Sequence, residues 1–65
     1  MKPKEKAKEV YNRFFELTPK WLENDRAIDL AKLNSLTAIK LVLSTNLFAN
    51  EKNYWLNVFD KIKEL

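Results

Sequence analysis

The chain has 65 residues, with 12 Lys or Arg against nine Asp or Glu and a formal net charge of +3. It contains no His, Cys or Gly, which excludes imidazole as metal ligand or general base, thiol chemistry, and the glycine loops that hold nucleotide phosphates. We therefore expect one domain over residues 1–65 that is not an enzyme and binds no cofactor or metal.

The first predicted helix begins near Pro3, because proline is well tolerated in a first helical turn. Apolar side chains then recur every three or four residues, as in an amphipathic helix with one buried face: Ala7, Val10, Tyr11, Phe14 and Leu17. Thr18 and Pro19 favour the start of a new helical segment, with threonine as its N-cap and proline in its first position. We expect a short extra helical turn near residues 19–23.

The middle helix is predicted to begin at the Asn24-Asp25 cap and to end near Ser44 or Thr45. Apolar side chains cover almost its whole circumference, and few charges interrupt them: Asp29, Lys32 and Lys40. Two flanking helices can cover only two of its sides, so a third side is left for the core or for another protein. The narrow face formed by Ala27, Ala31 and Ala38 would allow another helix to approach closely.

The last helix is predicted from an Asn50 cap onwards. Its apolar residues again repeat at helical spacing: Trp55, Val58, Phe59, Ile62 and Leu65. No alternating strand pattern occurs in the chain. The sequence therefore predicts an all-α fold, a small three-helix bundle made of a helical hairpin plus an N-terminal helix.

The positive charge is concentrated at the start of the chain, where residues 1–20 hold six basic against three acidic residues. Four lysines alternate there: Lys2, Lys4, Lys6 and Lys8. Lysines in a first helical turn oppose the helix dipole. This cluster indicates either a contact to phosphates or an acidic protein surface, or a solvated terminus.

The polar face of the first helix separates charges of opposite sign. Its middle is acidic, with Glu5, Glu9 and Glu16, while Lys8 borders one side and Lys2, Lys6 and Arg13 border the other. The acidic row would repel a nucleic-acid backbone, so a nucleic-acid-binding module is the least favoured function.

Two aromatic residues, Trp21 and Phe48, fall in the predicted connectors. Each either plugs an end of the bundle or contacts a partner, because aromatic side chains are enriched at interfaces. The longest apolar run, Leu36–Leu43, is too short to span a membrane. Because Met1-Lys2-Pro3-Lys4 is followed by charge rather than by an apolar signal segment, we expect a cytoplasmic protein.

Three stretches of the chain resemble a family of very short helical proteins encoded by phages and prophages of the Bacteroidota. They are the opening Pro3-Lys4-Glu5-Lys6-Ala7-Lys8-Glu9-Val10, the middle Ala31-Lys32 with Leu36, Ala38-Ile39 and Val42-Leu43, and the closing Tyr54-Trp55 with Val58, Ile62 and Leu65. Among such proteins the chain looks most similar to anti-CRISPR proteins acting on type VI-B systems, whose effector is an RNA-guided ribonuclease.

The resemblance implies a non-enzymatic inhibitor that binds this effector in the bacterial host cell and interferes with its guide RNA or with target cleavage. In that role the acidic row would engage positive grooves of the effector, and the lysines would contact guide-RNA phosphates. The predicted partner-binding residues are Lys2, Lys4, Lys6, Lys8, Glu5, Glu9, Arg13, Glu16, Trp21 and Phe48. The alternative is a small structural or regulatory protein that forms a homodimer through its middle helix.

Overall fold

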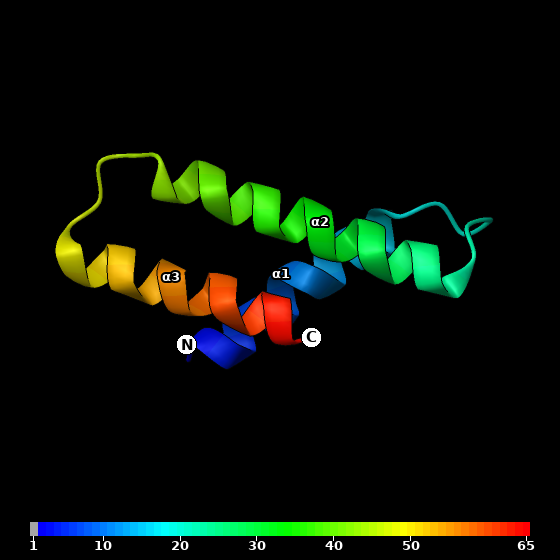
Figure 1. Ribbon diagram of the computed structural model, residues 1–65, viewed down its shortest axis with the longest axis horizontal. Coiled ribbons are helices and arrows are strands. Elements are labelled where there is room, and N and C mark those ends of the chain that lie inside the picture. Colours follow the sequence, from blue (N-terminus) through cyan, green and yellow to red (C-terminus); the bar gives the residue numbers. More distant parts are fainter. Residues whose placement is uncertain (1) are drawn as a thin grey trace.

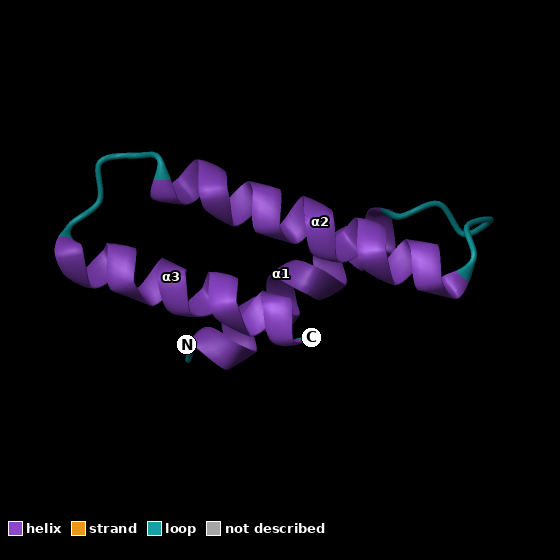
Figure 2. Ribbon diagram, in the orientation of Figure 1, coloured by secondary structure: helices purple, strands orange, loops and turns teal. Residues whose placement is uncertain are grey.

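The protein is an all-α three-helix bundle, as the sequence predicts (Figure 1). The computed structural model describes residues 2–65, with helices α1 (Pro3–Leu17), α2 (Asn24–Leu43) and α3 (Ala49–Glu64). Helices α2 and α3 form an antiparallel hairpin, and α1 crosses behind both of them (Figure 2). Each helix packs against the other two, so every helix buries one face.

The core is small and is formed by residues from all three helices. Its fully buried members are Ala7, Ile39, Val58 and Ile62, and six partly buried side chains pack around them: Val10, Leu36, Leu43, Tyr54, Trp55 and Phe59. These positions recur every three or four residues along their helices, which is the spacing that places side chains on one face. Helical periodicity therefore explains the core.

The buried side of α2 is lined mainly by small residues spaced four apart: Ala27, Ala31, Ser35 and Ile39. Ser35 has no exposed surface, and its Oγ donates a hydrogen bond to the Ala31 carbonyl oxygen at 2.7 Å. The hydroxyl is therefore satisfied within its own helix. Since interhelical distance depends on the side chains at the contact, this small-residue row lets the neighbouring helices approach α2 closely.

The end of α1 differs from the sequence prediction. Leu17, predicted on the buried stripe, is 77% exposed, whereas Thr18 is buried. Thr18 is the C-cap of α1, and its Oγ1 donates to the Phe14 carbonyl oxygen at 2.8 Å. The prediction that Thr18 is an N-cap is therefore wrong. Its hydroxyl satisfies a carbonyl of the preceding helix.

The connector between α1 and α2 contains a single hydrogen-bonded turn where a short extra helical turn was predicted near residues 19–23. The Leu22 amide donates to the Pro19 carbonyl oxygen at 3.2 Å, and no further helical bond follows. A helical nucleus costs conformational entropy that one hydrogen bond does not recover. So short a segment therefore stops after a single turn.

The helix termini lie within two residues of the predicted ones, but the capping residues differ. Glu23 and Phe48 occupy the N-cap positions of α2 and α3, in place of the predicted Asn24 and Asn50, and neither makes a side-chain capping bond. At the other end of α2, the hydroxyls of Ser44 and Thr45 donate to carbonyl oxygens of the last turn, each at 2.7 Å. The same two carbonyl oxygens also accept the backbone amides of Ser44 and Thr45, so each hydroxyl adds a second bond to the last turn.

Candidate partner-binding surface

The predicted charged residues of α1 lie on the side of the helix away from the core. Seven of them are exposed: Lys2, Lys4, Lys8, Glu5, Glu9, Arg13 and Glu16. Lys2 is the N-cap residue, and Pro3 occupies the first helical turn as expected. The arrangement of the face follows from the amphipathic pattern, because the apolar stripe of the same helix is turned toward α2 and α3.

Lys6 and Glu9 join the basic flank to the acidic row. Lys6 is half-buried, and its Nζ lies 3.1 Å from Glu9 Oε1. Between residues 2 and 65, the other predicted charged residues of α1 form no ion pair. The acidic row and the lysines are therefore not two independent surfaces, because the Lys6–Glu9 ion pair connects them.

Three of the predicted charged residues border an apolar hollow between the helices: Lys6, Glu9 and Arg13. We call this hollow the α1–α2 slot. Its apolar lining comes from all three helices: Val10, Phe14, Ala38, Ile39, Val42 and Trp55. The slot has a volume of about 310 Å³, which is enough for one large side chain of a partner. An apolar floor with a charged rim is the usual anatomy of a protein-binding surface.

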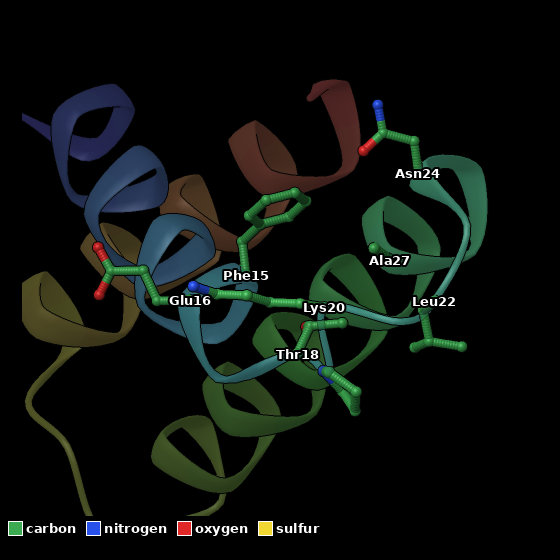
Figure 3. Close-up of a pocket in the computed structure, with 8 residues that line it drawn as sticks. Phe15, Glu16, Thr18, Lys20, Leu22, Asn24 and Ala27 are labelled. Carbon is green, nitrogen blue, oxygen red and sulfur yellow. The ribbon is translucent and has the colours of Figure 1, made fainter.

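A second hollow lies beneath the α1–α2 connector (Figure 3). It has a volume of about 340 Å³ and is lined by Phe15, Glu16, Thr18, Pro19, Lys20, Leu22, Asn24 and Ala27. Figure 3 shows the Lys20 side chain extending back toward Glu16 on α1. Glu16 is the only predicted partner-binding residue on this hollow, which is therefore separate from the three on the slot.

Trp21 and Phe48 are both exposed but do not lie together. Trp21 is 82% exposed in the α1–α2 connector, and Phe48 is 78% exposed in the α2–α3 connector. These connectors stand at opposite ends of α2 (Figure 1), and a helix of 20 residues spans about 30 Å. The sequence left open whether these side chains plug the ends of the bundle or contact a partner. In the structure, neither of them plugs an end.

Two further exposed residues were not among the predicted sites. Leu33 and Leu41 on α2 are 60% and 66% exposed. Between them Thr37 donates its hydroxyl to the Leu33 carbonyl oxygen at 2.9 Å. The almost wholly apolar circumference of this helix was the signal for such a surface, but the sequence does not say which side the neighbouring helices leave uncovered.

Comparison of the chain with family profiles, with curated proteins and with solved structures finds no match. Within residues 2–65, no helix has the length and hydropathy needed to cross a membrane, and no cluster of carboxylates is placed to hold a metal ion. A functional proposal is therefore argued from the surface features described above.

Proposed function

We propose that this protein is a non-enzymatic inhibitor that binds a host defence complex, with the type VI-B CRISPR RNA-guided ribonuclease as the partner. The observation that carries the binding role is the α1–α2 slot, where an apolar floor meets unpaired Arg13 and the Lys6–Glu9 pair. The choice of partner rests on the resemblance of the three sequence stretches. Binding would act by interfering with the guide RNA or with target cleavage.

The slot suits a partner segment in which a large apolar side chain stands beside an acidic group. The apolar side chain would fill the floor near Val42 and Trp55, and Arg13 at the rim would bond the acid. Guanidinium groups bind carboxylates through two parallel hydrogen bonds, which adds orientation to affinity. Apolar burial would supply most of the affinity, and the charged rim would select the partner.

The test is co-purification of tagged protein with the guide-loaded effector, followed by an assay of target-RNA cleavage. We expect association at micromolar concentration or below and a loss of cleavage. Two variants address the slot: Arg13→Glu reverses its free charge, and Ala38→Phe fills its floor. Each is expected to weaken binding by about tenfold or more, as truncation of interface anchors does.

Lys52→Glu on α3 is the matched control, because it makes the same charge change at an exposed position outside the slot. Its binding should stay within about threefold of the unmodified protein, as for charges at an interface rim. Absence of association with the effector would reject the partner. Association that survives both slot variants unchanged would reject the slot as the binding surface.

A further inference from the structure

We propose that two copies of this chain pair through α2 in an antiparallel arrangement. The contact surface is the row formed by Leu33, Thr37 and Leu41, which we call the α2 row. Leu33 and Leu41 are more than half exposed, and Thr37 directs its proton to the Leu33 carbonyl oxygen. The α2 row therefore presents mostly carbon to solvent. Residues spaced by four form one continuous ridge along a helix, which can pack into the grooves of a second helix.

The α2 row and the slot lie on different sides of the helix. With about 100° of rotation per residue, Leu33 and Leu41 lie within about 40° of Thr37, whereas Ala38 and Val42 of the slot lie about 100° or more away. The row also lies roughly opposite the buried small-residue row of α2. A second copy on the α2 row would therefore leave the slot open, and the pair would carry two slots.

The charges beside the α2 row fit a second copy of the same helix. Asp29 and Lys40 lie on the same flank of the row, both are exposed, and neither forms an ion pair with residues 2–65. When two identical helices pair antiparallel about a two-fold axis, each flank faces the same flank of the other copy. With the two-fold axis at the level of Asn34 and Ser35 along the helix, Asp29 of each copy lies level with Lys40 of the other, so opposite charges meet twice.

The exposed aromatic residues at the two ends of α2 match the same arrangement. Trp21 precedes α2 and Phe48 follows it. Antiparallel pairing brings the beginning of one α2 to the end of the other, so Trp21 of one copy and Phe48 of the second are at the same end of the pair. The register that pairs the charges therefore also brings the two aromatic residues to the same level.

The size of the surface sets the expected strength. A contact between two helices of this length, to which each copy adds one aromatic residue at either end, covers less than the roughly 800 Å² per partner of a typical stable interface. We therefore expect a dimer with a micromolar dissociation constant. Sedimentation equilibrium of the protein alone, between about 1 and 500 µM, should show monomer at the low end and dimer at the high end.

Two sets of variants test the geometry. Leu33→Gln together with Leu41→Gln should raise the dissociation constant by about tenfold or more, because four leucines leave the contact. Asp29→Lys should raise it by about fivefold, and adding Lys40→Asp should restore it, because the pairs are then reversed in sign. Leu56→Gln, at an exposed leucine of α3, is the control and should have no effect.

A protein that is monomeric at every concentration would overturn the proposal. So would a dimer that is insensitive to the Leu33 and Leu41 variants, or one in which the double charge exchange is no tighter than Asp29→Lys alone. Circular dichroism of each variant establishes that it is folded. The measurement uses no partner, so its outcome is independent of the inhibitor function proposed above.

Discussion

Ser35 illustrates how a single small side chain adapts to the interior of this bundle. It lies at the middle of the buried side of α2 with no exposed surface, yet its hydroxyl bonds only to the Ala31 carbonyl of its own helix. No buried side-chain polar atom within residues 2–65 lacks a hydrogen-bond partner. The contribution of Ser35 to stability is therefore its small volume, because the hydroxyl makes no bond between helices.

A pair of substitutions at this position separates volume from hydrogen bonding. Ser35→Ala should change the free energy of unfolding by less than about 0.5 kcal/mol, since the carbonyl keeps its backbone partner and alanine favours helix. Ser35→Leu should lower it by about 1–3 kcal/mol, because a larger side chain overpacks the contact. Urea denaturation followed by circular dichroism measures both. Equal losses for the two variants would show that the hydroxyl stabilises the fold.

At the scale of the helices, the apolar periodicity located all three elements to within two residues. The local hydrogen bonds were predicted less well. Thr18, Asn24 and Asn50 were assigned as N-caps from residue type, but short polar side chains bond to several nearby backbone groups. Thr18 bonds backward to Phe14 and ends α1. Which backbone group such a side chain bonds depends on the groups that the tertiary fold leaves free. Residue type alone does not give this information.

The missing caps offer a route to greater stability. Glu23 is the N-cap residue of α2 and makes no side-chain capping bond. Glu23→Asp keeps the charge and supplies a preferred capping side chain, so the free energy of unfolding should rise by about 0.5–1 kcal/mol. In a domain of this size that is a rise in melting temperature of about 3–6 °C.

Glu23→Gln is the control for this change. It provides no preferred cap and removes a negative charge from the positive end of the helix dipole, so stability should stay level or fall by about 0.3 kcal/mol. If Glu23→Asp melted at or below the temperature of Glu23→Gln, the aspartate would not be capping the helix. That result would contradict the position of residue 23 as the N-cap of α2.

For the candidate site, the sequence predicted the order of charges on α1 but not the hollow beside them. The positions of Lys6 and Arg13 on one flank follow from helical geometry alone. The slot forms only where that flank meets Ala38 and Val42 of α2 and Trp55 of α3. These residues are far apart in sequence, and no periodic pattern within one helix relates them.

At the scale of the whole molecule, the bundle is elongated, with extents of 40 × 20 × 15 Å. A chain of 65 residues in this form buries a limited core, and such domains have low stability. Several large apolar residues stay outside the core and are exposed, among them the leucines of the α2 row and the aromatic residues of the connectors. The outer surface of the protein is consequently rich in places where a second molecule could bind.

The topology also predicts the rate of folding. Neighbouring helices joined by short connectors make many local contacts, and such proteins fold in microseconds to milliseconds. Trp21→Phe leaves Trp55, which packs against the core, as the single tryptophan. Temperature-jump relaxation of its fluorescence should lie in that time range, with unchanged stability because Trp21 is exposed. Refolding that takes seconds would contradict a mechanism dominated by local contacts.

The amino-acid sequence by itself determined the number of helices, their approximate ends and the charge pattern of α1. It could do so because helical periodicity is a local property, visible in any stretch of a dozen residues. Only the tertiary structure decided that Leu17, Leu33 and Leu41 are exposed while Ser35 is buried, and that residues of all three helices line an open slot. Burial depends on where neighbouring helices lie, and for a helix that is apolar on nearly every side, like α2, its own sequence cannot choose between those sides.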